Sequence, residues 1–238
     1  MLRLILAMLL AATPALAAPP KRAAVKPVDW TKTVVATPEG GYRIGNPAAT
    51  VALVEYGSLT CSHCRAFHLA GFETLKAKYI ASGRLSYEYR SLILNGPDLA
   101  AVLLARCDGP AKFFARTDMF YQTQPEWLGK ASQISEADAA AVRTAPPEQA
   151  LVKLVSGIGL DKFAAAHGIS AARINACLTD KAALDRVTAM RAAAAKRDVN
   201  GTPTFFVNGV RQQDGEGALA RPLITWEDLA PRLAAALR

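Results

Sequence analysis

The sequence predicts an α/β fold interrupted by an all-helical insertion, and two observations indicate it. A strand-like run, a helical stretch and a second strand-like run follow one another between residues 45 and 96, the order of a βαβ unit. About a hundred residues rich in Ala and Leu then show helical patterns without a convincing strand, before β-rich sequence returns at GTPTFFVNGVRQ. A helical block inserted into an α/β frame accounts for this order.

The N-terminus, residues 1–18, has the pattern of a secretory signal peptide. One positive charge at Arg3 precedes an apolar run that is too short to span a bilayer, and small residues follow, ending in Ala15-Leu16-Ala17. We expect cleavage after Ala17 or Ala18 and export to an oxidising compartment. Residues 19–43, rich in Pro, Ala and Lys near their start, are predicted to form an exposed N-terminal arm.

The net charge of the 238-residue chain is +8, which is compatible with nucleic acid, membranes or acidic partners. The Lys and Arg residues are, however, spread along the predicted helices and mixed with acids. Solvated helical faces explain this pattern better than a nucleic-acid surface does, so we expect no nucleic-acid partner.

The first part of the α/β frame is predicted over residues 44–96. Gly45, Asn46 and Pro47 mark a turn, and the apolar run from Val51 to Tyr56 indicates a buried strand. A helical stretch follows the first two cysteines and ends at Gly83, and RLSYEYRSLIL indicates a second strand by its alternation.

The helical insertion is predicted over residues 97–182 and the second part of the frame over residues 183–238. GTPTFFVNGVRQ predicts β structure with a turn at Asn208-Gly209. WEDLAPRLAAAL predicts a closing amphipathic helix that starts near Thr225 or Trp226. Pro231 lies inside this pattern, so the helix either begins a turn later or is kinked.

Two cysteines, Cys61 and Cys64, lie where a strand is predicted to give way to a helix. Backbone N–H groups and the helix dipole stabilise a thiolate at that place, which makes Cys61 the predicted nucleophile. Cys64, one turn further on, can close a disulfide with Cys61 or resolve a mixed disulfide. Ser62 and His63 lie between them, and we expect His63 to lower the pKa of Cys61.

Metal binding is the main alternative for this pair. A structural zinc ion usually needs four ligands, and no second C-x-x-C or H-x-x-H motif is present. We therefore predict no resident metal and no cofactor besides a redox-active Cys61–Cys64 disulfide. A copper(I) site made by the two thiolates, as in a metallochaperone, and two inert buried thiols remain open.

These residues resemble the DsbA-type thiol:disulfide oxidoreductases of the bacterial periplasm, which have a thioredoxin fold. The resemblance rests on VALVEYGSLTCSHC, on the helical insertion with its LLARCDG and FYQTQPEW stretches, and on GTPTFFVNG. It covers about residues 44–238. It implies a thioredoxin-like fold with an inserted helical domain.

The resemblance also assigns roles to individual residues. Pro203 matches the cis-proline that faces the active disulfide, and Thr202 precedes it; both are expected to bind an extended substrate segment. Glu55 resembles the buried acid that accepts the proton of the second cysteine. Ser62 stands where many members have proline, which leaves the redox potential open.

Cys107 and Cys177 both fall in the insertion. In an oxidising compartment they are expected to pair, and related proteins with ARC and a later CL resemble this arrangement. Two buried helical thiols are the alternative.

The function that these observations predict is oxidation of thiols in newly exported proteins. We expect a monomer whose Cys61–Cys64 disulfide passes to reduced exported proteins, and a membrane quinone-linked partner resembling DsbB that reoxidises it. A disulfide isomerase, a reductase or a partner-specific thiol carrier on the same fold is the first alternative. The copper(I) metallochaperone is the second.

Overall fold

The fold was obtained as a computed structural model that describes residues 28–215 and 220–238. The predicted signal peptide and residues 19–27 of the predicted arm lie outside the described residues. Within those ranges, no helix is long and apolar enough to cross a membrane.

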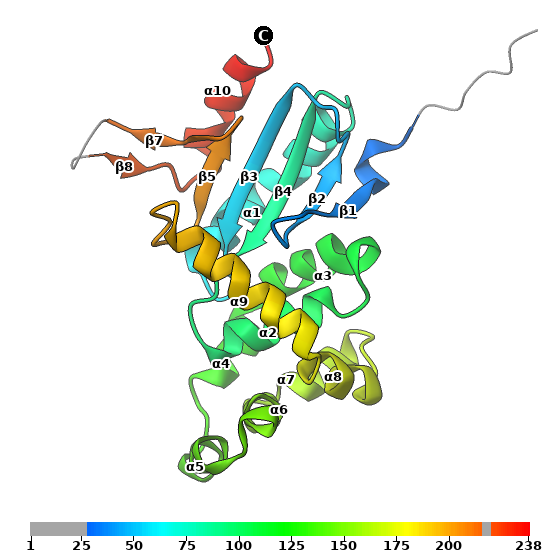
Figure 1. The fold of residues 1–238 in the computed structure, drawn as a ribbon, viewed down its shortest axis with the longest axis vertical. Coiled ribbons are helices and arrows are strands. Elements are labelled where there is room, and N and C mark those ends of the chain that lie inside the picture. The colour runs from blue at the N-terminus through cyan, green and yellow to red at the C-terminus, as the bar shows by residue number, and fades with distance from the viewer. Residues whose placement is uncertain (1–27, 216–219) are drawn as a thin grey trace, which may run out of the picture.

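A six-stranded mixed sheet forms the centre of the α/β frame, in the order β1-β2-β4-β3-β5-β6 (Figure 1). Strands β3 and β4 pair in parallel, as a βαβ unit requires, and β5 runs antiparallel to β3. The strands are β1 (Val34–Ala36), β2 (Tyr42–Gly45), β3 (Val51–Gly57), β4 (Leu85–Ser91), β5 (Thr204–Val207) and β6 (Val210–Arg211).

The predicted exposed arm over residues 19–43 is wrong for its described C-terminal part. A short 3₁₀ turn, η1 (Trp30–Lys32), leads into β1, and β1 and β2 join the sheet as its edge, with β2 paired to β4. Tyr42 and Ile44 alternate along β2 and are both buried. This alternating apolar pair, separated from β1 by a Gly-Gly turn, is a strand pattern, which the overall composition of the segment did not indicate.

The βαβ unit is as predicted. Helix α1 (Ser62–Thr74) continues through a π-helical turn, η2 (Leu75–Ile80), between β3 and β4. The alternation read in β4 does not correspond to one solvated face, because all seven of its residues are buried. Both faces of the sheet are covered, and a strand covered on both faces needs no polar side.

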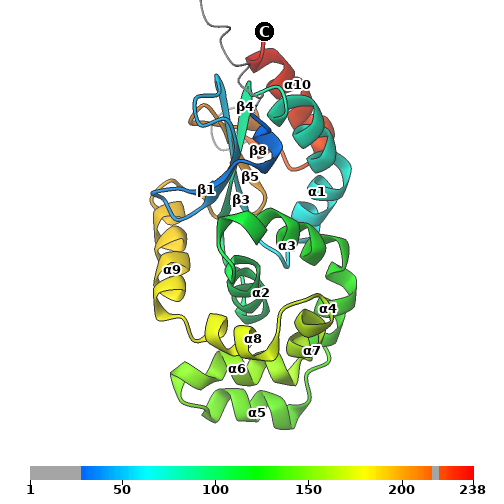
Figure 2. The same ribbon diagram turned by 90° about the vertical axis from the view of Figure 1, so that its right-hand side faces the viewer.

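Helices α1 and α10 (Trp226–Ala236) cover one face of the sheet, and the end of α9 (Lys181–Ala195) covers the other (Figure 2). Gly71 of α1 lies so close to the Trp226 indole that a Cβ would overlap it, which lets the two helices approach. Ala194 of α9 packs with Tyr56 and Phe206 on the opposite face. Phe205, the residue before Phe206 on β5, belongs to the main core on the first face, so neighbouring residues of β5 point into different cores.

Helix α10 begins at Trp226, with Thr225 as its N-cap, and continues past Pro231. The predicted start is confirmed, and the helix does not begin a turn later. The turn at Asn208-Gly209 joins β5 to β6, with both residues at positive φ. A separate pair of strands, β7 (Gln213–Asp214) and β8 (Arg221–Pro222), precedes α10.

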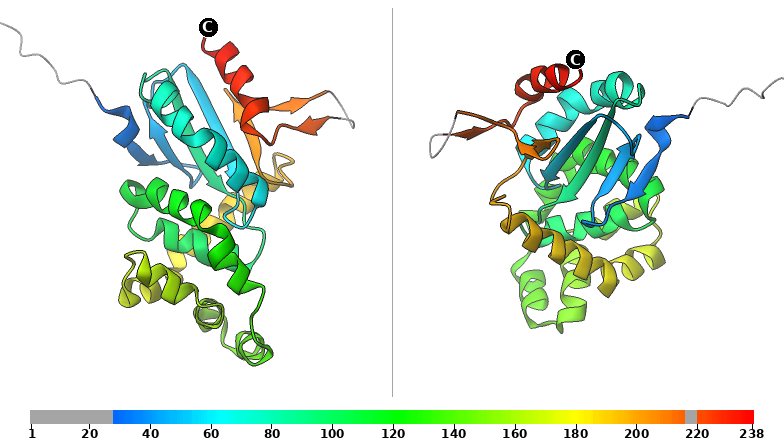
Figure 3. Two further views of the ribbon diagram at one scale, coloured as in Figure 1. Left: turned by 180° about the vertical axis from the view of Figure 1, so that it is seen from behind. Right: turned by 45° about the horizontal axis from the view of Figure 1, so that its top comes forward.

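The insertion is helical throughout its described length and lies below the sheet (Figure 3). The boundary predicted between residues 182 and 183 falls inside α9, so the helical block continues to Ala195. Its other helices are α2 (Gly96–Arg106), α3 (Pro110–Gln122), α4 (Gln124–Ala131), α5 (Glu136–Thr144), α6 (Pro147–Gly157), α7 (Leu160–Ala166) and α8 (Ala171–Leu178).

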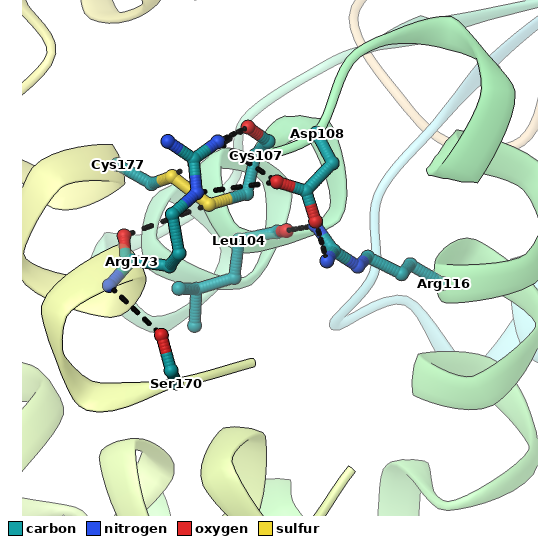
Figure 4. Close-up of polar contacts among 7 residues, drawn as sticks. All are labelled: Leu104, Cys107, Asp108, Arg116, Ser170, Arg173 and Cys177. Carbon is teal, nitrogen blue, oxygen red and sulfur yellow. Dashed lines mark hydrogen bonds and ion pairs between the residues drawn. A yellow bond between two sulfur atoms is a disulfide. The ribbon is translucent and has the colours of Figure 1, made fainter. Parts of the chain in front are cut away.

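A disulfide joins Cys107, at the end of α2, to Cys177 of α8, with a Cα–Cα distance of 5.4 Å. Figure 4 shows this bond beside Asp108, whose carboxylate accepts hydrogen bonds from Arg116 and from Arg173. The pairing expected for these two cysteines is thus present in the structure. It closes a loop that contains α3 to α8.

Candidate active site

Cys61 is the N-cap of α1, at the junction with the loop that follows β3. The Cys64 N–H donates to Cys61 Sγ at 3.3 Å, as the side chain of a helix N-cap allows. Both cysteines are thiols in this structure, and both are buried. The strand-to-helix junction therefore holds the two sulfurs of the C-x-x-C motif together, with Cys61 at the positive end of the helix dipole.

The pKa of the Cys61 thiol is lowered from its usual value to about 5. A hydrogen bond from the Cys64 thiol is the largest cause, and the Thr202 side chain and the backbone N–H groups of Cys64 and His63 add to it. Burial opposes them. Cys61 is consequently a thiolate at neutral pH, which is the form that attacks disulfides and leaves them readily.

Cys64 has the opposite chemistry. Complete burial raises its pKa well above the usual value, and its hydrogen bond to Cys61 and the nearby Glu55 carboxylate raise it further. Cys64 is thus a protonated thiol at neutral pH, and it needs a base before it can act as a nucleophile. The structure divides the two cysteines into an ionised and a protonated partner, as their predicted roles require.

Glu55 lies on β3 and is 1% exposed, so it does not face solvent. Its Oε2 accepts a hydrogen bond from the Tyr87 hydroxyl at 2.6 Å. Burial raises the pKa of Glu55 to about 8, with a smaller contribution from the Cys61 thiolate, while the Tyr87 hydrogen bond opposes the rise. A carboxyl group that changes protonation near neutral pH beside Cys64 can take and return a proton there.

The loop before β5 closes the other side of the site. The peptide bond between Thr202 and Pro203 is cis, the geometry that the resemblance implied. The carbonyl oxygen of Thr202 lies 3.3 Å from Cys61 Sγ. This contact brings together residues 141 positions apart in the sequence.

Ser62 and His63 occupy the first turn of α1, and both side chains are exposed. His63 lowers the pKa of Cys61 through its backbone N–H. The tuning role predicted for its imidazole therefore stays a prediction. Ser62 has no described hydrogen bond from its side chain, and its expected influence on the redox potential likewise stays a prediction.

Sequence reasoning missed the residues that hold the loop before Cys61. The Asp98 carboxylate and the Gln124 side-chain amide, both from the insertion, bind the backbone of Leu59. Asp98 follows Asn95 by three positions, which suggests only a helix cap, and Asn95 does cap α2. Gln124 lies in the FYQTQPEW stretch, which the resemblance identified as a family feature without assigning a role to Gln124.

A resident metal has little to bind to in the described ranges. No group of three or more His, Cys, Asp or Glu residues there could hold a metal ion. The two active-site sulfurs are the one pair of soft ligands that the sequence analysis considered, so copper(I) binding by them stays an untested alternative.

The chain is similar to known proteins over most of its described length. A family model described as thioredoxin matches residues 37–217. A Rickettsia typhi protein that is named as a protein-disulfide oxidoreductase is 32% identical over 173 residues, which cover 72% of this chain and 56% of the relative. A Rickettsia conorii protein of the same name is 31% identical and is covered over 53% of its length. The chain thus spans a little over half the length of the curated relatives it matches.

Two solved structures have the same fold. The protein-disulfide isomerase of Novosphingobium aromaticivorans is 27% identical, with a TM-score of 0.73, over 82% of this chain and 96% of that one. Wolbachia pipientis alpha-DsbA1 is 22% identical, with a TM-score of 0.62, over 83% of this chain and 90% of that one. The second likeness concerns the fold alone.

A thioredoxin fold with a helical insertion, and a C-x-x-C pair at a helix N-terminus opposite a cis-proline, define the class of thiol:disulfide oxidoreductases. The chain belongs to the thioredoxin family, whose model matches residues 37–217. The predicted fold class is confirmed.

Proposed function

We propose that the protein oxidises pairs of thiols in exported proteins by donating its Cys61–Cys64 disulfide. The observation that carries the proposal is the contrast between the two sulfurs, a Cys61 thiol with a pKa lowered to about 5 beside a protonated, buried Cys64. Stabilising the thiolate stabilises the reduced protein, and a stable reduced form makes the disulfide a stronger oxidant.

The reaction balances in two exchanges. A substrate thiolate attacks Cys61 Sγ, the Cys61–Cys64 bond breaks, and Cys64 leaves and takes a proton from Glu55. A second substrate thiolate then attacks the substrate sulfur of the mixed disulfide, and Cys61 leaves as a thiolate. The substrate loses two electrons and its two thiol protons, and the protein gains the two electrons. One proton remains on Cys64 once Glu55 is reprotonated, and the other is released to solvent. The low pKa of Cys61 favours its departure in the second step.

The setting that we propose is the periplasm, reached through the signal peptide of residues 1–18. Reduced exported proteins are the substrates, and the protein acts as a monomer without a metal or organic cofactor. Reoxidation then needs an electron acceptor, which we assign to a membrane quinone-linked partner resembling DsbB. The pattern of Arg3, the apolar run and Ala15-Leu16-Ala17 supports export.

The test is the reduction potential of the Cys61–Cys64 pair in glutathione buffers. We expect a potential above about −200 mV, in the range of protein thiol oxidants. A potential well below that value contradicts the oxidase assignment. Turnover on a reduced, unfolded protein with several cysteines, with glutathione disulfide as the final oxidant, is the second measurement, and Cys61→Ala is its inactive control.

Disulfide isomerisation is the second candidate, and the 27% identity to the Novosphingobium isomerase favours it. An isomerase uses the Cys61 thiolate to attack a wrong disulfide and needs no net oxidant. Scrambled protein incubated with the reduced protein separates the two functions. Recovery of native pairing without added oxidant supports isomerisation, and its absence supports the oxidase.

A further inference from the structure

The loop of Ser58, Leu59 and Thr60 connects β3 to Cys61, and its polar groups are bound by the helical insertion. The Asp98 carboxylate accepts a hydrogen bond from the Ser58 hydroxyl at 2.7 Å through Oδ2, and one from the Leu59 N–H at 2.9 Å through Oδ1. Asp98 comes from the first turn of α2. One side chain of the insertion thus fixes two consecutive residues of the loop.

Other insertion residues complete this support. Gln124 Nε2 donates to the carbonyl oxygen of Leu59 at 2.8 Å and to that of Cys61 at 3.1 Å. The Tyr121 hydroxyl donates to the carbonyl oxygen of Ser58 at 3.1 Å. The backbone just before the nucleophile is therefore held by α2, α3 and α4, which the basic thioredoxin frame lacks.

Asp98 differs from the other residues that bind the loop because its side chain is ionisable and is buried from solvent. It is 0% exposed, and its third hydrogen bond comes from the Leu94 N–H at 2.9 Å. Burying a carboxylate is costly unless several donors satisfy it, and burial raises the pKa of Asp98 to about 6. A buried hydrophobic residue would fill the space at lower cost but could not bind the loop.

We propose that Asp98 is a positioning residue of the redox centre, which acts through Ser58 and Leu59 to hold Cys61 against the donors that stabilise its thiolate. In the structure the loop delivers Cys61 to α1 with its Sγ 3.3 Å from the Cys64 N–H, one of those donors. The proposal rests on the proposed function and refines it, since a stabilised Cys61 thiolate makes the Cys61–Cys64 disulfide more oxidising.

The sign of the effect separates positioning from simple charge. A negative charge near Cys61 disfavours the thiolate, so removing the charge alone lowers the pKa of Cys61. Loss of position moves Sγ away from its donors and raises that pKa. A role confined to stability changes the unfolding free energy and leaves the pKa of Cys61 where it was.

The experiment measures the pKa of Cys61 in the reduced protein from thiolate absorbance near 240 nm. Asp98→Ala removes the charge and all three hydrogen bonds. Asp98→Asn removes the charge and one of the two acceptor oxygens, because its NH2 group must face one of the two backbone N–H donors. Asp108→Asn is the matched control, because Asp108 lies just beyond the other end of α2 and binds Arg116 and Arg173 instead of the loop. Ser58→Ala removes the hydrogen bond to Asp98 and the two contacts of the Ser58 hydroxyl with Thr60, and it keeps the charge of Asp98.

We expect Asp98→Ala to raise the pKa of Cys61 by about one unit, the effect of weakening one hydrogen bond to a charged sulfur. The equilibrium with glutathione should then shift about tenfold toward the oxidised protein. Ser58→Ala should raise the pKa by a smaller amount. Asp98→Asn should change it by less than Asp98→Ala does, because its loss of charge opposes its loss of a hydrogen bond, and Asp108→Asn should leave it unchanged.

An unchanged or lowered pKa in folded Asp98→Ala overturns the proposal. If that variant does not fold, Ser58→Ala decides: a raised pKa supports positioning, and an unchanged one rejects it. The measurement needs no protein substrate, so its outcome is independent of whether the protein proves to be an oxidase.

Discussion

At the scale of single residues, the site combines groups whose protonation the fold has shifted in opposite directions. The pKa of Cys61 is lowered to about 5, and that of Glu55 is raised to about 8. The C-x-x-C motif after a predicted strand was sufficient to select Cys61, whereas Glu55 was selected through the resemblance to the DsbA-type proteins. The sequence could not supply Tyr87 as the partner of Glu55, or Asp98 as the partner of Ser58, because those contacts cross 32 and 40 positions.

Glu55 yields a prediction about stability and pH. Its folded pKa is above its unfolded value, so the folded state is penalised as pH rises from about 4.5 through 8. Glu55→Gln removes that penalty and keeps a partner for Tyr87. Urea unfolding should show the variant to be more stable by on the order of 4 kcal/mol at pH 8 and by little at pH 4.5.

The same substitution removes the group that gives a proton to Cys64 and takes it back, so we expect it to slow thiol exchange while it increases stability. A matched control is Glu88→Gln, on the next strand, which is paired with Arg90 instead of lying beside the thiols. Equal stability of Glu55→Gln and the unchanged protein at pH 8 would contradict a buried Glu55 with a raised pKa.

At the scale of secondary-structure elements, the edge hairpin of β1 and β2 is where composition misled the sequence analysis. The preceding Pro-Ala-Lys stretch suggested an exposed arm, yet residues 42–45 pair with β4 along their whole length. The pattern that matters is short, a buried residue at every second position, and such a pattern is weak in a strand of four residues. The longer elements, α1, β3, β4 and α10, were predictable because their periodicity extends over more residues.

The hairpin gives a second prediction. Ile44 is 2% exposed and packs in the main core, so Ile44→Ala should lower the unfolding free energy by about 2–4 kcal/mol. Val35, on the neighbouring strand, is 39% exposed, and Val35→Ala should change it by less than about 1 kcal/mol. Equal, small effects in chemical denaturation would mean that β2 does not contribute to the core.

At the scale of the whole molecule, the redox state of the active site is coupled to global stability. A depressed folded pKa at Cys61 stabilises the reduced protein fully above the unfolded value near 9 and not at all below about 5. The raised pKa of Glu55 penalises both redox forms and largely cancels from their comparison.

We therefore expect the reduced protein to be more stable than the protein with a Cys61–Cys64 disulfide at neutral pH. The Cys61 thiolate accounts for on the order of 3 kcal/mol of this difference at pH 7, and the difference should shrink as pH falls to 5. Denaturant unfolding of both forms, with Cys107–Cys177 left intact, measures it. An oxidised form that is more stable at pH 7 would contradict the proposed oxidase.

The second disulfide acts on the molecule as a whole because of where it lies. Cys107 and Cys177 stand near the two ends of the insertion, 70 positions apart, so their bond encloses α3 to α8 in one loop. Closing a loop of that length removes chain entropy from the unfolded state worth about 4 kcal/mol. Replacing both cysteines by Ala should lower the unfolding free energy by roughly that amount, less any relaxation of the folded state.

The Cys61–Cys64 bond closes a far shorter loop, and Cys61→Ala with Cys64→Ala is the matched control, for which the same entropy argument gives a smaller loss. An unchanged unfolding midpoint for the Cys107, Cys177 double variant, with non-reducing peptide mapping finding both as free thiols in the unchanged protein, would show that this loop is open.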